Sequence, residues 1–349
     1  MRVLLTHPYG WPHVRRGAER ELHELAAHLV RSGVSAGILT GTPHGVTSRG
    51  RVDGVPVRYV RSPSRPGWEA PGPVFAAVAA LGTLGPADLV HCLHYTDAYG
   101  VSRLGRHPVV LKMTGTVRPE ALRGMDGRLV HGALARADEV WCNSEWAAGQ
   151  MAGFGVPMRV VPAGLDTTVF RPVGSRSERP LVVCAAAAGA PRKRVVDLLD
   201  AWPSVVRALP GARLVFAGQD PPASLPAGAT YVGPLADQAL AALYARAWVV
   251  VAPAVYEALG LVTLEALACG TPVAGVLSGA TPSLVPAGTG ALAAPMDPAS
   301  LAVAVVEAAG LSQRHGTVQR CREAAAAFGW ERVVPTVVEG YRRVLQQRG

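Results

Sequence analysis

The hydrophobic positions of the chain fall into short runs that alternate with longer amphipathic stretches. Residues 2–7 form an apolar run, a loop rich in glycine and proline follows, and residues 18–31 place apolar side chains at helical spacing. Further strand-like runs in the first half occupy residues 35–40, 55–60, 88–92, 109–113, 139–142 and 159–161. This alternation predicts a parallel β-sheet that helices cover on both faces.

The pattern breaks once and then restarts. Proline, glycine and serine interrupt it at residues 170–175. A helix near residues 195–209 follows, and a last helix at 330–346 is expected to return to the first domain. Apolar runs recur at residues 181–185, 213–217, 249–252, 272–276 and 290–293.

The predicted fold is therefore α/β, with two Rossmann-like parallel-sheet domains. We expect an N-terminal domain of residues 1–172, completed by residues 330–349, and a C-terminal domain of residues 173–329. In open α/β sheets, ligands bind beyond the carboxyl ends of the strands, so we expect the site in a cleft between two facing domains.

Composition supports a globular protein with two cores. The chain has 349 residues, 49% of them hydrophobic, and its 39 glycines and 29 prolines are dispersed rather than clustered. No apolar stretch approaches the roughly 20 residues that span a bilayer, and the first residues lack the features of a signal peptide. We therefore expect a cytoplasmic protein. The five cysteines are far apart in apolar contexts, which indicates reduced core thiols.

The net charge of +9 does not by itself identify a partner. The densest group of arginines, at positions 49, 51, 58, 61 and 65, has no interleaved aromatic residues and no nucleic-acid motif around it. We therefore expect no nucleic-acid partner, and interpret the charge as a solvated surface, with peripheral contact to an anionic membrane left open. No G-x-G-x-x-G and no P-loop occurs, which disfavours a dinucleotide-dependent dehydrogenase.

The most informative segment is residues 253–273, PAVYEALGLVTLEALACGTPV. A strand ends in a loop that carries Glu257, Gly260 permits close backbone approach, and a helix from about Leu261 to Cys269 contains Glu265. Amides at this helix start, around Gly260, Leu261 and Val262, can meet hydroxyl or phosphate oxygens. The two carboxylates can bind the hydroxyl groups of a sugar and a ribose.

This segment resembles the E-x7-E signature of the retaining GT-B glycosyltransferases of the GT4 family. The resemblance implies that Glu257 contacts the transferred sugar and that Glu265 contacts the ribose of the nucleotide. It extends over nearly the whole chain, through the glycine loop at residues 11–20 and the segments NSE at 143–145 and GLDTTVFRP at 164–172. Phe328, Trp330 and Tyr341 are similar to residues that surround the family's returning C-terminal helix.

The segment PRKRVVDLLDAW at residues 191–202 is similar to the family's loop that binds the donor diphosphate. The resemblance assigns this task to Lys193. Composition supports the assignment, because nearly every basic residue is arginine and Lys112 and Lys193 are the only lysines in the sequence. A compact ammonium retained against that bias indicates a point charge that neutralises phosphate.

Three positions depart from the family pattern. Alanines at 185–188 stand where relatives commonly have an arginine, and we hypothesise that Arg192 or Arg194 supplies the missing charge. In the first glycine loop, the segment Arg15-Arg16-Gly17 replaces a frequent glycine pair, so Gly17 alone is left for close approach to the donor. Lys112 stands at a strand end where relatives often present a histidine, and either faces the cleft or is paired within the domain.

Three histidines are candidates for the acceptor side of the cleft, the alternative being ordinary packed or surface histidines: His13, His91 and His94. A spacing of three on a strand would put His91 and His94 on opposite faces, which disfavours a shared metal. No D-x-D occurs either. We therefore expect no metal and no cofactor, the nucleotide sugar being a co-substrate.

The resemblance implies a retaining transferase that moves a hexose-type sugar from a nucleotide diphosphate sugar to a hydroxyl acceptor. UDP-sugars are the default donor by family analogy, and the acceptor is a lipid, a saccharide or a small natural product. The arginine- and alanine-rich composition indicates a GC-rich, bacterial genome. Two alternatives are a nucleotide-sugar 2-epimerase of the same fold and a non-catalytic nucleotide-sugar-binding partner protein. The sequence does not indicate the oligomeric state.

Overall fold

The chain divides into two compact units in a computed structural model that describes residues 1–11, 17–42, 47–61, 86–117, 122 and 124–348. Unit 1 consists of residues 1–164 and 330–349, and unit 2 of residues 165–329. The division falls after residue 164, earlier than the break in the sequence pattern, because residues 165–176 pack within unit 2. Phe170 is buried there against Tyr244, and Arg176 donates to the carbonyl of Gly270 at 3.0 Å.

The described part of unit 1 contains an eight-stranded sheet with the order β3-β4-β2-β1-β5-β6-β7-β8. All neighbouring strands are parallel except β3 and β4, which form a hairpin. Its turn places Asp53 and Gly54 at positive φ, the conformation that an Asp-Gly hairpin turn requires. The strands are β1 (Arg2–His7), β2 (Ser35–Thr42), β3 (Ser48–Val52), β4 (Val55–Arg61), β5 (Leu89–Cys92), β6 (Val109–Met113), β7 (Glu139–Cys142) and β8 (Met158–Val160).

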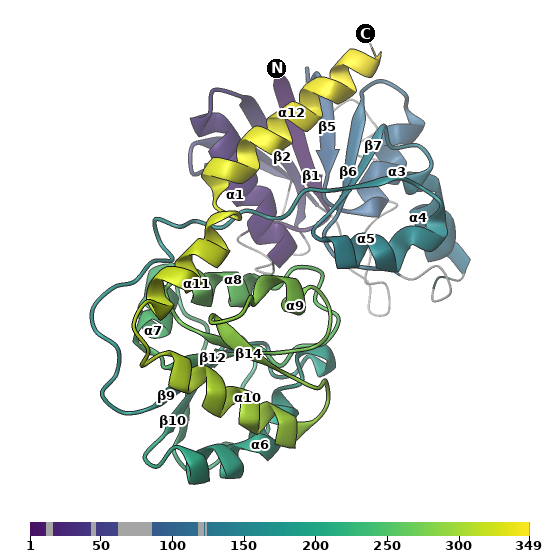
Figure 1. Ribbon diagram of the computed structural model, residues 1–349. Helices are drawn as coiled ribbons and strands as arrows, with labels where there is room; N and C mark the ends of the chain where they lie inside the picture. Colours follow the sequence, from purple (N-terminus) through teal and green to yellow (C-terminus); the bar gives the residue numbers. More distant parts are fainter. Residues whose placement is uncertain (12–16, 43–46, 62–85, 118–121, 123, 349) are drawn as a thin grey trace. The chain divides into compact units, whose positions relative to one another are not determined.

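Helices α1 (Gly17–Arg31) and α12 (Trp330–Arg348) pack side by side in unit 1 (Figure 1). Their apolar faces join the inward residues of β1, β2, β4 and β5 in one core, which contains Leu22, Leu25, Val337 and Tyr341. The remaining described helices of this unit are α3 (Tyr95–Arg103), α4 (Gly124–Leu134), α5 (Glu145–Met151) and the 3₁₀ turn η2 (Ala152–Phe154).

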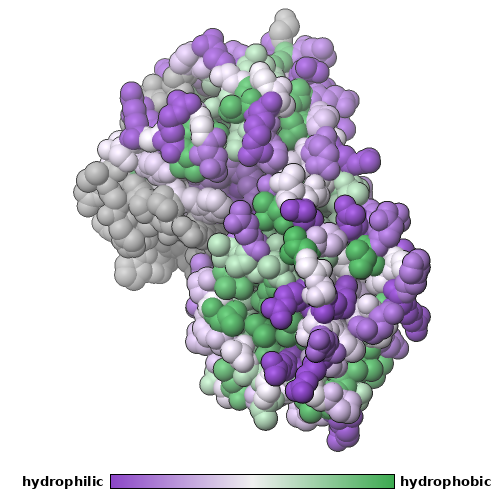
Figure 2. All heavy atoms as spheres, turned by 90° about the vertical axis from the view of Figure 1, so that its left-hand side faces the viewer, coloured by the Kyte–Doolittle hydropathy of each residue, from purple (hydrophilic) through white to green (hydrophobic). Residues whose placement is uncertain are grey.

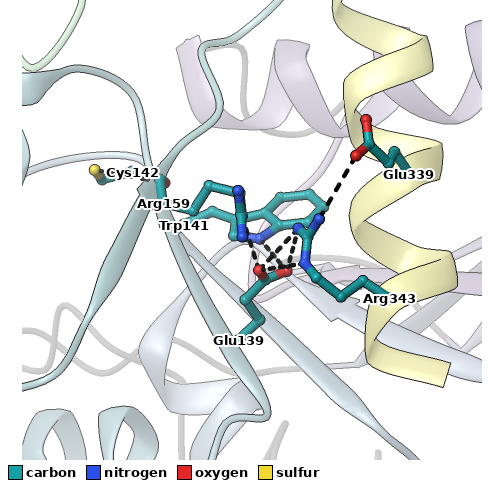
Figure 3. A network of polar contacts seen from close by, with 6 residues as sticks. All are labelled: Glu139, Trp141, Cys142, Arg159, Glu339 and Arg343. Carbon is teal, nitrogen blue, oxygen red and sulfur yellow. Dashed lines mark hydrogen bonds and ion pairs between the residues drawn. The ribbon is translucent and has the colours of Figure 1, made fainter. Parts of the chain in front are cut away.

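A polar network fixes α12 to the edge of the unit 1 sheet (Figure 3). Glu139 of β7 accepts hydrogen bonds from Arg159 Nε at 2.8 Å, from Arg343 Nη2 at 2.9 Å and from Trp141 Nε1 at 2.8 Å. Burial alone would raise the pKa of Glu139, but these donors outweigh it and lower the pKa below its ordinary value. The ionised carboxylate therefore ties the last helix to β7 and β8.

Unit 2 contains a six-stranded, fully parallel sheet with the order β11-β10-β9-β12-β13-β14. Since parallel neighbours run in the same direction, their carboxyl ends all lie at one edge of the sheet. The strands are β9 (Leu181–Ala185), β10 (Arg213–Ala217), β11 (Ala229–Tyr231), β12 (Val249–Val251), β13 (Val273–Val276) and β14 (Gly290–Ala293).

Helices cover both faces of the unit 2 sheet (Figure 1). On one face, α6 (Val195–Ala208) packs beside α10 (Pro298–Leu311) over a core that includes Trp202 and Val305. On the other face, α8 (Leu261–Ala268) packs beside α7 (Asp237–Arg246) and α11 (Thr317–Ala326). The 3₁₀ turn η3 (Pro191–Lys193) and α9 (Thr281–Leu284) complete the unit. Its surface in Figure 2 mixes hydrophilic and hydrophobic residues.

The chain leaves unit 1 and returns to it at adjacent points. Leu165 donates its amide to the carbonyl of Phe328 at 2.8 Å and pairs with Gly329 in a parallel bridge. Gly164 lies so close to the Trp330 ring that a Cβ on this glycine would meet a ring carbon at 2.2 Å. Among the described helices, none has the length and apolar character needed to cross a membrane.

Candidate functional site

The candidate site of unit 2 lies in three loops that follow neighbouring strands. The loop after β9 carries Arg192 and Lys193, the loop after β12 carries Glu257, and the loop after β13 carries Gly279. In the sheet, β12 lies between β9 and β13. The parallel topology therefore brings together residues that are far apart in the sequence.

Glu257 binds two cations through one oxygen atom. Nη1 of Arg192 lies 2.7 Å from Glu257 Oε1, and Nζ of Lys193 lies 2.6 Å from the same atom. The side chains of Glu257 and Lys193 are 16% and 23% exposed, and that of Arg192 is 57% exposed. Two positive charges against one carboxylate leave an excess of positive charge that a larger anion can neutralise.

The backbone holds Glu257 in place from two sides. The amide of Val255 donates to the carbonyl of Arg192 at 2.9 Å, which joins the loops after β12 and β9. The carbonyl of Glu257 accepts from the amide of Ala280 at 2.9 Å. Gly279, at φ +66°, packs so closely that a Cβ there would lie 2.6 Å from the amide nitrogen and the carbonyl oxygen of Glu257. Only glycine fits this position without moving the loop.

Two residues adjacent in sequence to Lys193 and Glu257 adopt a left-handed backbone conformation. Arg194 has φ +50° and Tyr256 has φ +58°. Such conformations are costly for residues with a Cβ and persist where surrounding contacts impose them, often at functional sites. Here Arg194 is the N-cap of α6, and the amide of Tyr256 donates to Ser278 Oγ at 3.1 Å.

The start of α8 closely follows Glu257 in the sequence. Gly260 has φ +103° and is the N-cap, and its carbonyl accepts from the amide of Thr263 at 3.0 Å. Leu261 and Val262 are half-buried and belong to the first turn. Amides of a first turn lack partners within the helix and favour anions, so this turn suits phosphate or hydroxyl oxygens.

Glu265 lies in the interior of α8 and is 3% exposed. Tyr244 of α7 donates its hydroxyl to Glu265 Oε2 at 3.4 Å, and burial raises the pKa of that hydroxyl well above its ordinary value, helped by the nearby carboxylate. A ribose would therefore approach a carboxylate that already has a protein partner. The role of Glu265 toward a ribose stays a prediction.

The structure distinguishes between the two arginines that could supply the missing charge. Arg194 is held by Asp197, with Nε 2.9 Å from Oδ2 and Nη2 2.5 Å from Oδ1, and these contacts raise the pKa of its guanidinium. Arg192 instead contacts Glu257 beside Lys193. Its position favours Arg192 over Arg194 as the second cation for a diphosphate.

Lys112, the other lysine, lies in the core of unit 1. It is 1% exposed, near the end of β6, and its ammonium donates to Oε1 of Glu21 in α1, which is 4% exposed. Of the two interpretations, a paired strand-end lysine is the one that this geometry supports. The pair joins α1 to the sheet beneath it.

The histidine candidates have different surroundings. His13 lies outside the described residues. His91 is wholly buried on β5, with Nδ1 2.6 Å from the hydroxyl of Tyr341, and burial followed by the charge of Lys112 lowers its pKa well below the ordinary value. His94 follows the strand and is the N-cap of α3, where its side chain accepts from the amide of Thr96 at 3.3 Å. Gly17, the remaining candidate, is exposed at the first position of α1.

Within the described ranges, no group of three or more histidine, cysteine or acidic side chains is arranged to hold a metal ion. All five cysteines are buried and form no disulfide. Burial raises the pKa of the Cys184 thiol to about 12, which keeps it protonated and inert.

Two family models match the chain, one in each unit. The first, described as "Glycosyl transferase 4-like domain", matches residues 16–164, and the second, "Glycosyl transferases group 1", matches residues 179–310. The chain belongs to the GT4 family of glycosyltransferases.

Curated relatives carry glycosyltransferase names. A "D-inositol 3-phosphate glycosyltransferase" of Mycolicibacterium paratuberculosis is 33% identical over 219 residues, which are 54% of this chain and 48% of that protein. A "GDP-mannose-dependent alpha-(1-6)-phosphatidylinositol dimannoside mannosyltransferase" of Mycobacterium tuberculosis is 32% identical over 221 residues, 58% of this chain and 57% of that protein. The chain spans about half the length of the curated relatives it matches.

Solved structures share the fold over almost the whole chain. Sucrose-phosphate synthase from Thermosynechococcus elongatus has a TM-score of 0.81 at 21% identity, and the match covers 99% of this chain and 99% of that chain. HepE from Anabaena in complex with UDP has a TM-score of 0.75 at 19% identity and covers 98% of this chain and 100% of that chain. The fold is the predicted GT-B fold of two parallel-sheet α/β domains.

Sequence reasoning missed the residues that hold the site residues in place. They are Asp197 against Arg194, Tyr244 against Glu265, Glu21 against Lys112, and the Ser278-Gly279 turn against Glu257. For the turn a signal existed, because Ser-Gly directly follows an apolar run and so lies at the carboxyl end of a strand. The three side-chain partners have no such signal, since each contact joins residues on separate elements or depends on a side-chain conformation.

Proposed function

We propose that the protein transfers a hexose-type sugar from a nucleotide diphosphate sugar to the hydroxyl group of an acceptor, with retention of anomeric configuration. The observation that carries the proposal is the convergence of Arg192 and Lys193 on Glu257, next in sequence to the first turn of α8. Two cations and a helix start suit a diphosphate leaving group, and a carboxylate suits sugar hydroxyls.

In the proposed reaction the anomeric C–O bond breaks and the diphosphate takes the electron pair. Arg192, Lys193 and the first amides of α8 stabilise the negative charge that grows on it. The acceptor hydroxyl attacks the same face of the sugar and its proton passes to the departing phosphate oxygen. On this route no enzymatic nucleophile and no metal ion is required.

The donor and acceptor classes follow by analogy. HepE was crystallised with UDP. The name of one mycobacterial relative specifies GDP-mannose and a phosphatidylinositol dimannoside, and the name of another specifies inositol 3-phosphate. We propose UDP-sugars first and GDP-mannose second as donors. For acceptors we propose a sugar-like polyol, free or attached to a lipid, or a small natural product.

The test is a thermal-shift screen of UDP- and GDP-sugars, followed by incubation with inositol 3-phosphate, phosphatidylinositol and sugar acceptors. Mass spectrometry then measures the product. We expect one donor to raise the melting temperature and one acceptor to gain the mass of a sugar, and K193A to abolish both effects. If no nucleotide sugar shifts the melting temperature, the proposal is wrong. Epimerised donor formed without acceptor would instead identify an epimerase.

A further inference from the structure

We infer that Glu257 holds Arg192 and Lys193 ready in the empty enzyme, and that it thereby favours the loaded donor over the spent nucleotide. The inference rests on the proposed function, in which both cations bind the diphosphate. Its basis is the shared contact with one carboxylate oxygen, at 2.7 Å from Arg192 and 2.6 Å from Lys193.

The first step concerns the cations themselves. Arg192 is 57% exposed and has a long side chain, so it would sample many conformations without a partner. Lys193 lies next to it, and two like charges this close repel each other. The carboxylate of Glu257 offsets the repulsion and fixes both side chains. It occupies the place of an anion and lowers the ordering cost of binding one.

The second step concerns what happens to Glu257 when a diphosphate binds. The cations exchange the carboxylate for phosphate oxygens, and Glu257 loses both ion pairs. Its backbone cannot withdraw, because Gly279 packs against it and Ala280 donates to its carbonyl. The carboxylate therefore remains beside the bound diphosphate, where like charges repel unless new donors reach it.

The third step gives the selectivity. A nucleotide sugar brings the hydroxyl groups of the transferred sugar, which can donate to the displaced carboxylate, whereas a nucleoside diphosphate lacks that sugar and carries more negative charge on its terminal phosphate. Glu257 thus penalises the product more than the donor. This is specificity through an unfavourable contact with the wrong ligand, and it would speed release of the spent nucleotide.

The experiment is isothermal titration calorimetry of the wild-type chain and E257Q with inorganic pyrophosphate, UDP and UDP-glucose. GDP and GDP-mannose replace the uridine pair if the guanine donor is preferred. Glutamine keeps the shape and removes the charge. The amide oxygen of glutamine can still accept from both cations and order them, while the repulsion of a bound anion is gone. We therefore expect E257Q to bind pyrophosphate and the nucleoside diphosphate about tenfold more tightly than wild type and the nucleotide sugar no more tightly. E307Q, which removes a charge from the exposed face of α10, should change none of these affinities.

The outcomes separate the inference from the proposed function. If R192A and K193A lose nucleotide binding but E257Q binds the diphosphate no better than wild type, the selectivity role of Glu257 is wrong while the proposed function stands. If R192A and K193A bind the nucleotide as wild type does, the proposed function is wrong and the inference falls with it.

Discussion

The ammonium of Lys193 lies 2.6 Å from Oε1 of Glu257, although 64 positions separate the two residues in the sequence. The contact follows from the topology of unit 2, since β9 and β12 are parallel neighbours and both residues lie in the loops at their carboxyl ends. A contact set by strand order can be broken by a side-chain change without disturbing the core. Activity and folding can therefore be tested separately.

Replacing Lys193 with alanine should lower turnover by roughly 100-fold or more, because a positioned charge on a leaving group contributes several kcal/mol to transition-state stabilisation. The melting temperature should change little, since the side chain is partly exposed. Initial rates and a thermal melt check both points. R207A, on the exposed side of α6, is the matched control and should retain full activity. A near-normal rate in K193A would refute the assignment.

Arg192 and Arg194 should respond differently to alanine substitution. R192A should lower both turnover and donor affinity, by about tenfold or more, because it removes the exposed guanidinium that contacts Glu257 beside Lys193. R194A should act mainly on stability, since its guanidinium binds Asp197 at the start of α6. Steady-state kinetics and urea unfolding separate the two effects. Unchanged kinetics in both variants would mean that neither supplies the missing charge.

Gly279 offers a test of how the backbone positions Glu257. G279A should lower turnover because the new Cβ would lie 2.6 Å from the Glu257 backbone and push that residue away from Lys193. Gly211 is the matched control: it has φ +76°, so alanine is equally strained, but nothing lies within 4 Å of the added Cβ. G211A should lose only the stability that the positive φ costs, less than G279A loses, and keep its activity. Equal activities would argue against this positioning role.

Removing Lys112 should destabilise unit 1 strongly. In K112M, Glu21 remains buried without its cation, and breaking a buried pair in this way costs about 3–5 kcal/mol. The double variant K112M/E21Q should recover part of the loss because the buried charge is gone. Urea unfolding measures both. R106M, at an exposed position just before β6, controls for the loss of a positive charge and should be neutral.

Acid should weaken the attachment of α12 through Glu139. The pKa of Glu139 in the folded protein lies below the ordinary value of 4.5, so its stabilisation is present above that pH and disappears as the pH falls through the folded pKa. E139Q should therefore be less stable than the wild type at neutral pH, and its stability should fall less steeply than that of the wild type below about pH 4.5. Melts across this pH range test it. E339Q, at a position 77% exposed, should follow the wild-type curve.

Much of the fold was predictable because apolar runs mark buried parallel strands. The runs at 2–7, 109–113, 139–142, 181–185, 213–217 and 290–293 are strands with those bounds. The hairpin strand β3 escaped prediction, since SRGRV is polar and exposed, and its pairing with β4 is what makes it a strand. β11 is a short edge strand with little apolar pattern of its own.

The candidate site was predictable only in part. The resemblance to the family's motifs indicated Glu257 and Lys193, and a departure from the family pattern suggested Arg192. Strand order places all three together. The commitment of Arg194 to Asp197 was not predictable, because both residues are compatible with many side-chain conformations. That Glu21 is the partner of Lys112 was equally unpredictable, since the contact joins a helix and a strand through residues that lie 91 positions apart in the sequence.

The backbone hydrogen bond between Leu165 and Phe328 joins the two ends of unit 2, which is therefore an insertion into unit 1. Residues 165–329 form one uninterrupted stretch, while unit 1 is closed across Gly164 and Trp330, which touch. The gene can therefore be cut at these two places. One fragment, residues 165–329, would encode unit 2 alone. A second gene, in which a short linker joins residue 164 directly to residue 330, would encode unit 1 alone. Ligand binding by each unit could then be measured independently.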